Sequence, residues 1–120
     1  MSGKRRILVV DDENAIRTLA KTVLERAGYE VTTARDGREA IALLAKSDYD
    51  VVLLDVTMPN LNGLGVVDEL RKNNMAALAH TYLLTAGNSQ QLIGLPVRGV
   101  IEKPFNISSL IAEAKDCIGH

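Results

Sequence analysis

Two short runs made only of apolar residues constrain the fold of this chain most strongly. They read Ile-Leu-Val-Val at residues 7–10 and Val-Val-Leu-Leu at residues 51–54. A strand that is apolar on both faces is typical of the interior of a parallel sheet, because helices cover such a sheet on both sides. The two runs therefore predict interior strands of an α/β domain.

Stretches of helical period alternate with these runs and with three further candidate strands. Strands are predicted at residues 7–10, 29–34, 51–54, 81–84 and 97–101. The first helix ends at Gly28, and its predicted apolar face consists of Ile16, Leu19, Ala20, Val23, Leu24 and Ala27. Asp36 and Glu39 form a capping pair for a second helix. Further helices are predicted at about residues 64–72 and at residues 107–118, which gives a doubly wound five-stranded parallel sheet.

The connection between the fourth and fifth strands is short. Any helix there begins near Asn88 and Gln91, which form a capping pair, and ends before Gly94 and Pro96. The fourth helix is therefore predicted to have only one or two turns.

Composition indicates one compact domain and excludes several functions. A chain of 120 residues with 47% hydrophobic content suits a single domain over residues 1–120, with a core of about 5–118. A net charge of -1 gives no basic footprint for nucleic acid. A lone cysteine, Cys117, cannot form an internal disulfide, and no apolar run approaches the length of a membrane span. We therefore expect a cytoplasmic domain that binds neither nucleic acid nor membrane directly.

Polar side chains follow four of the predicted strands. Asp11 and Asp12 follow the first strand, Asp55 the third, Thr85 the fourth and Lys103 the fifth. The carboxyl ends of parallel strands meet at one edge of the sheet, where such folds bind ligands. Two adjacent acids alone would be explained by their favourable interaction with the dipole of the helix that follows them. The helix dipole does not explain a third carboxylate after a different strand.

These residue types suit a phosphoryl group. Mg²⁺, or Mn²⁺, prefers oxygen ligands, and the three carboxylates with a backbone carbonyl near Thr57 would supply them. The Lys103 ammonium would pair with one phosphoryl oxygen and the Thr85 hydroxyl would bond another. The pattern therefore predicts a metal-assisted phosphoryl site at this edge.

The combined pattern resembles the response-regulator receiver domain of two-component signalling, a CheY-like superfamily. The resemblance rests on the Asp11-Asp12 pair, the stretch LLDVTMPNLNG at residues 53–63, the Thr85-Ala86 pair and Lys-Pro-Phe at residues 103–105. It covers nearly the whole chain, and its order and spacing across the strand ends make it specific. It implies a flavodoxin-like (βα)5 fold with strand order 2-1-3-4-5.

The resemblance also implies roles for individual residues. Asp55 would be the phosphoacceptor, which takes its phosphoryl group from a sensor histidine kinase or a histidine phosphotransfer protein. Asp11 and Asp12 would hold the metal, while Thr85 and Lys103 would sense the adduct and signal to a downstream protein. The domain would not be an enzyme, since it would catalyse only its own phosphorylation and dephosphorylation.

One departure concerns the switch. Val100 stands where many receivers carry the Tyr or Phe that moves with the switch threonine. Together with the short fourth helix, it favours an alternative, a pseudo-receiver that signals through protein contacts without phosphorylation.

Two classes of enzyme are alternatives, and each can be tested by a motif that it needs in the sequence. A P-loop nucleotidase needs a Gly-rich loop ending in Gly-Lys and Ser or Thr, which the sequence lacks. An aspartate-based phosphatase usually carries a second acid two residues after its nucleophile, where this chain has Thr57.

Overall fold

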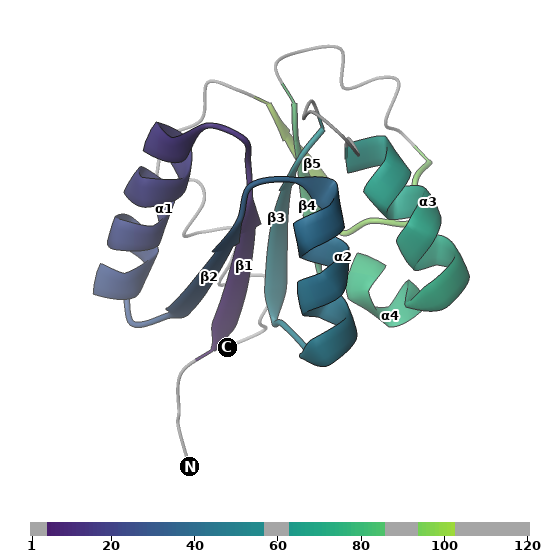
Figure 1. The fold of residues 1–120 in the computed structure, drawn as a ribbon, viewed down its shortest axis with the longest axis horizontal. Coiled ribbons are helices and arrows are strands. Elements are labelled where there is room, and N and C mark those ends of the chain that lie inside the picture. The colour runs from purple at the N-terminus through teal and green to yellow at the C-terminus, as the bar shows by residue number, and fades with distance from the viewer. Residues whose placement is uncertain (1–4, 57–62, 86–93, 103–120) are drawn as a thin grey trace.

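The computed structural model describes residues 5–56, 63–85 and 94–102. Five parallel strands form one sheet in the order β2-β1-β3-β4-β5 (Figure 1). Their bounds are β1 Arg6–Val10, β2 Glu30–Ala34, β3 Val51–Asp55, β4 Thr81–Thr85 and β5 Gly99–Glu102. The predicted doubly wound sheet and its strand order are confirmed.

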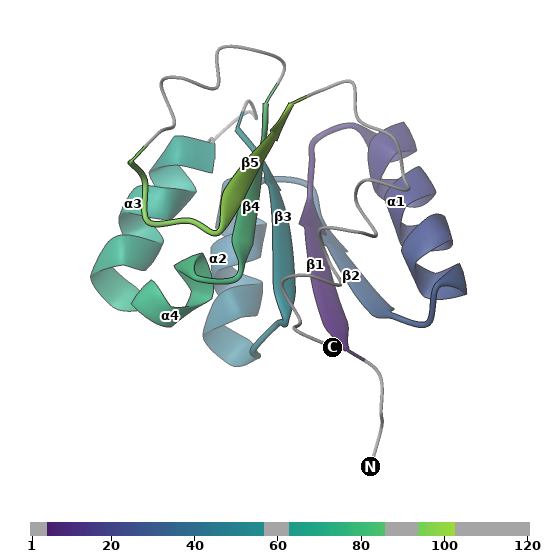
Figure 2. The same cartoon turned by 180° about the vertical axis from the view of Figure 1, so that it is seen from behind.

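Helices cover both faces of this sheet. Their bounds are α1 Asn14–Arg26, α2 Gly37–Lys46, α3 Gly63–Asn73 and α4 Met75–Leu78. The helix α1 lies against one face, and α2, α3 and α4 lie against the other, as the views from opposite sides show (Figure 1 and Figure 2). Among the helices that the structure describes, none is long and apolar enough to cross a membrane.

The all-apolar strands supply both layers of the core. Along β3, Val52 and Leu54 pack with the buried side chains of α2, α3 and α4, whereas Val51 and Leu53 pack with those of α1. All four side chains are at most 1% exposed. Successive side chains of a strand point to opposite faces, so a strand buried on both sides has to be apolar throughout.

The predicted residues are found after the end of α1 and at the start of α2. Gly28, two residues after α1, has a φ of 102°, a left-handed conformation that favours glycine. The Asp36 carboxylate accepts a hydrogen bond from the Glu39 N–H at 2.9 Å, and the Glu39 carboxylate accepts one from the Arg35 N–H at 3.0 Å. These bonds satisfy backbone donors around the first turn of α2.

The structure departs from the predictions in two places. The helix α4, which lies between α3 and β4, was not predicted. It differs from the short fourth helix that the sequence predicts between strands four and five. Leu19 was expected on the buried face of α1 but is 51% exposed, and Ala27 is exposed as well. The buried residues of α1, Ala20 and Leu24, lie one turn apart, and Leu19 lies about 100° around the helix from Ala20.

Some predicted features lie outside the described residues. They are the short helix between strands four and five, the closing helix at residues 107–118, and Cys117.

Candidate functional site

The site is built where β1 and β3 end at the same edge of the sheet. These strands are neighbours, with Val10 paired to Leu54 in parallel register. The acidic residues follow at once: Asp11 and Asp12 come directly after β1, and Asp55 is the last residue of β3. Parallel pairing therefore brings together carboxylates that are more than forty positions apart in the sequence.

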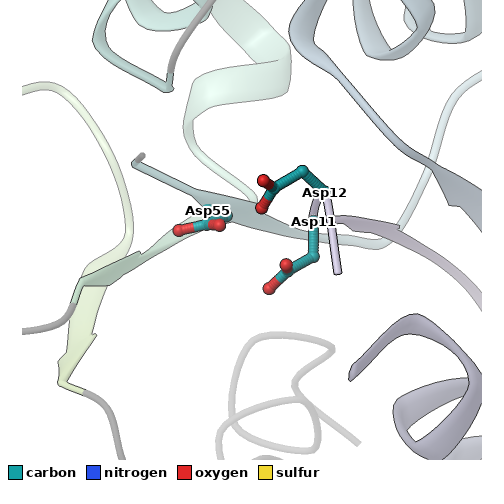
Figure 3. A group of neighbouring side chains, drawn as sticks. All are labelled: Asp11, Asp12 and Asp55. Carbon is teal, nitrogen blue, oxygen red and sulfur yellow. The ribbon is translucent and has the colours of Figure 1, made fainter. Parts of the chain in front are cut away.

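The three carboxylates converge as the sequence predicts. One oxygen from each of Asp11, Asp12 and Asp55 lies within 4.8 Å of the others. Figure 3 shows Asp11 and Asp12 extending from the end of β1 and Asp55 from the adjacent strand toward a shared space. This is the arrangement expected of a divalent-cation site.

Burial divides the cluster into two parts. Asp11 is 0% exposed and Asp55 is 4% exposed, whereas Asp12 is exposed. Like charges repel more strongly where water is excluded, so burial strengthens the repulsion between Asp11 and Asp55. The exposed Asp12 leaves the cluster open to solvent on one side.

The donor set fits Mg²⁺. With ligands at about 2.1 Å, octahedral geometry places adjacent oxygens about 3.0 Å apart and opposite oxygens about 4.2 Å apart. Oxygens that already lie within 4.8 Å reach such positions by small side-chain movements. The donors found among the described residues are hard carboxylate oxygens, which favour Mg²⁺ or Mn²⁺ over softer metals.

Hydrogen bonds hold Asp11 in place. Its N–H donates to the Ala34 carbonyl at the end of β2, at 3.1 Å. Its carboxylate accepts from the Glu13 N–H at 2.9 Å. Its carbonyl oxygen accepts from Nη1 of Arg17 at 2.6 Å. Arg17 was not among the predicted site residues, because its partner is a backbone carbonyl and leaves no signal in the sequence.

Thr85 lies at the same edge, as predicted. It ends β4, is 8% exposed, and sits one position beyond Leu84, the register partner of Asp55. The Val56 N–H donates to the Leu84 carbonyl at 2.9 Å, so the pairing of β3 and β4 continues past Asp55. The remaining predicted site residues, Thr57 and Lys103, lie outside the described residues.

Comparison with known proteins agrees with this geometry. Residues 7–115 match the family model of the response regulator receiver domain. The chain belongs to this family. As a receiver domain, it is a module of two-component systems.

Individual relatives support the assignment. The probable transcriptional regulator ycf27 of Galdieria sulphuraria is 48% identical over 116 residues, which cover 93% of this chain and 44% of that protein. The structure of chemotaxis protein CheY4 of Vibrio cholerae has a TM-score of 0.86 at 33% identity, and the match covers 96% of this receiver domain and 99% of CheY4.

One similar structure contains a metal. The response regulator TrrA of Thermotoga maritima, in complex with Mg²⁺ and BeF, has a TM-score of 0.82 at 38% identity, and the match covers 94% of this chain and 98% of TrrA. The receiver domain spans just under half the length of the curated relatives it matches.

Proposed function

We propose that this receiver domain accepts a phosphoryl group on Asp55, with Mg²⁺ or Mn²⁺ bound by Asp11, Asp12, Asp55 and the backbone carbonyl of Thr57. The observation that carries the proposal is the convergence of three carboxylates from two strands within 4.8 Å. The phosphoryl donor is a phosphohistidine on a sensor histidine kinase or a histidine phosphotransfer protein.

The reaction is a displacement at phosphorus. A carboxylate oxygen of Asp55 attacks the phosphoryl group, an O–P bond forms, and the N–P bond of the phosphohistidine breaks with its electron pair left on the imidazole. Mg²⁺ supplies neutralisation of the charge on the phosphoryl oxygens when it is bound. Burial of Asp55 at 4% exposure limits access of water to its carboxylate.

Two further residues would respond to the adduct. The Thr85 hydroxyl would donate to one phosphoryl oxygen and the Lys103 ammonium would pair with another. Pulling the end of β4 toward Asp55 would change the adjacent surface. Val100 is half-buried on β5 next to Leu83 and would move with the end of β4. It would do so without the Tyr or Phe ring that many receivers carry at this position.

The domain then acts as a switch for another protein. We infer a downstream protein target, with no direct nucleic-acid or membrane contact by this domain, because its net charge is -1. Its chemistry would be confined to its own phosphorylation and dephosphorylation.

Intact mass spectrometry after incubation with acetyl phosphate and Mg²⁺ tests the acceptor. The native chain should gain one phosphate adduct and Asp55→Asn should gain none. Asp48→Asn is the matched control, because Asp48 is an exposed aspartate in the connection between α2 and β3, and it should gain the same adduct as the native chain.

Other outcomes are equally informative. An equal adduct on the native chain and on Asp55→Asn would reject Asp55 as the acceptor. No adduct on the native chain would reject phosphorylation and leave the pseudo-receiver alternative, in which the pocket serves only protein contacts.

NMR spectroscopy tests the metal separately. Addition of Mg²⁺ should shift the amide signals around Asp12 and Asp55, and a chelator should reverse the change. Shifts confined to residues far from these positions would count against the proposed site.

A further inference from the structure

Arg17 contacts the backbone of the acidic cluster. Its Nη1 donates to the Asp11 carbonyl oxygen at 2.6 Å, and its Nη2 donates to Oδ1 of Asn14 at 3.2 Å. The side chain is half-buried in the first turns of α1. A charged donor makes a stronger hydrogen bond than a neutral one, so the contact with Asp11 is a firm attachment.

The oxygen that Arg17 binds belongs to the peptide group joining Asp11 to Asp12. A peptide group is planar, so an oxygen held in place also fixes the direction in which Asp12 continues the chain. The N–H of Asp11 donates to a carbonyl at the end of β2. The carboxylate of Asp11 accepts from the Glu13 N–H. Arg17 therefore holds the part of the turn that links the buried carboxylate to the exposed one.

We propose that Arg17 is a positioning residue for the metal site, which keeps the carboxylates of Asp11 and Asp12 directed toward Asp55. The inference rests on the cation site of the proposed function. Arg17 itself binds no metal, and it acts only through the Asp11 carbonyl.

If Arg17 positions the cluster, its loss should change the Mg²⁺ affinity in the opposite direction from a simple charge effect. A guanidinium near the cluster repels a divalent cation, so loss of its charge alone would tighten Mg²⁺ binding. Loss of its hold on the peptide would instead weaken binding, because the three carboxylates would no longer be prearranged. The direction of the change thus separates positioning from electrostatics.

The test is the Mg²⁺ dissociation constant, measured by NMR shifts or calorimetry on the unphosphorylated chain. Arg17→Met should raise it by about tenfold, the lower end of what loss of an outer-shell partner costs. Arg17→Lys should restore part of the affinity, because it keeps a charged donor. Arg26→Met is the control for net charge, since Arg26 is exposed in the last turn of α1, and its affinity should match the native chain.

Several results would overturn the inference. Tighter or unchanged binding in Arg17→Met would show that Arg17 does not position the cluster, and equal weakening in Arg26→Met would show that the loss of affinity is not specific to Arg17. If Arg17→Met does not fold, Asn14→Ala replaces it, because it removes the second contact of the guanidinium. That variant should bind Mg²⁺ more weakly than the native chain, and unchanged affinity would reject the inference.

The outcomes also separate this inference from the phosphoacceptor proposal. A native chain that binds Mg²⁺ and is phosphorylated on Asp55, with no change in Arg17→Met, would overturn the role of Arg17 alone. A native chain that binds Mg²⁺ but gains no phosphate would overturn the acceptor role and leave Arg17 to be judged by affinity. No Mg²⁺ binding by the native chain would overturn both.

Discussion

Asp12→Asn should stabilise the metal-free domain while weakening its response to Mg²⁺. The Asp12 carboxylate lies within 4.8 Å of two other carboxylates, and the substitution removes its charge while keeping its shape. The side chain is exposed, so the substitution leaves the buried core intact. The variant isolates the repulsion that a bound cation would relieve.

The size of the effect follows from the separation. At 4.8 Å, two unit charges repel by about 0.9 kcal/mol at a dielectric constant of about 80 and by about 3.5 kcal/mol at about 20. Asp12 faces two such charges, but its exposure and the salt of the buffer favour the lower value. The expected gain is about 1–2 kcal/mol, or about 4–8 °C in Tm for a domain of this size.

Magnesium should reduce this advantage. At a Mg²⁺ concentration ten times the dissociation constant, binding stabilises the native chain by about 1.4 kcal/mol, which is RT ln 11. The Asn variant loses one charged ligand and should gain much less. The difference in Tm between the two proteins should therefore shrink on addition of Mg²⁺.

Thermal unfolding followed by circular dichroism, with a chelator and then with Mg²⁺, measures both effects. Asp68→Asn is the matched control, because it removes an exposed carboxylate that pairs with Lys72 at 3.5 Å. It should lower stability by about 0.5 kcal/mol or less and keep the full Mg²⁺ response. An Asp12→Asn domain that is less stable than the native chain in chelator, or equally responsive to Mg²⁺, would refute the reasoning.

Two further predictions concern the fold. Leu53→Ala should cost about 2–5 kcal/mol in urea unfolding, because Leu53 is 0% exposed, and Leu19→Ala should cost far less because Leu19 is 51% exposed; equal losses would contradict the difference in burial between these two residues. Asp36→Ala should cost about 1 kcal/mol by loss of its bond to the Glu39 N–H, and thermal unfolding that is unchanged would show that this cap is dispensable.

The strands and their acidic ends could be predicted from the sequence because the relevant signals are local. A run that is apolar at every position has to be buried on both faces, and the carboxyl ends of parallel strands share one edge. These rules place Asp55 and Asp11 at the same edge of the sheet, and the strand order, in which β1 and β3 are neighbours, brings them together. The structure adds that Thr85 is buried at that edge. The roles of Thr57 and Lys103 stay predictions.

Features that depend on tertiary contacts could not be predicted in the same way. The helix α4 has four residues, too few to show a helical period. Leu19 belongs to an apolar stripe, but the residues of α1 that are buried against the sheet are Ala20 and Leu24. The partner of Arg17 is a backbone carbonyl, which every residue possesses.

The division of the cluster explains why the peptide between Asp11 and Asp12 matters. Asp55 ends a fully buried strand, whereas Asp12 is exposed and lies beyond the last residue of β1, so its direction depends on the turn. Asp12→Asn removes the charge of the side chain and leaves the direction of the turn unchanged. Arg17→Met leaves the three carboxylates in the chain but removes the hydrogen bond that fixes the direction of Asp12. Both should weaken Mg²⁺ binding. In the metal-free domain they should act oppositely, because the first relieves repulsion and the second loses a charged hydrogen bond at 2.6 Å.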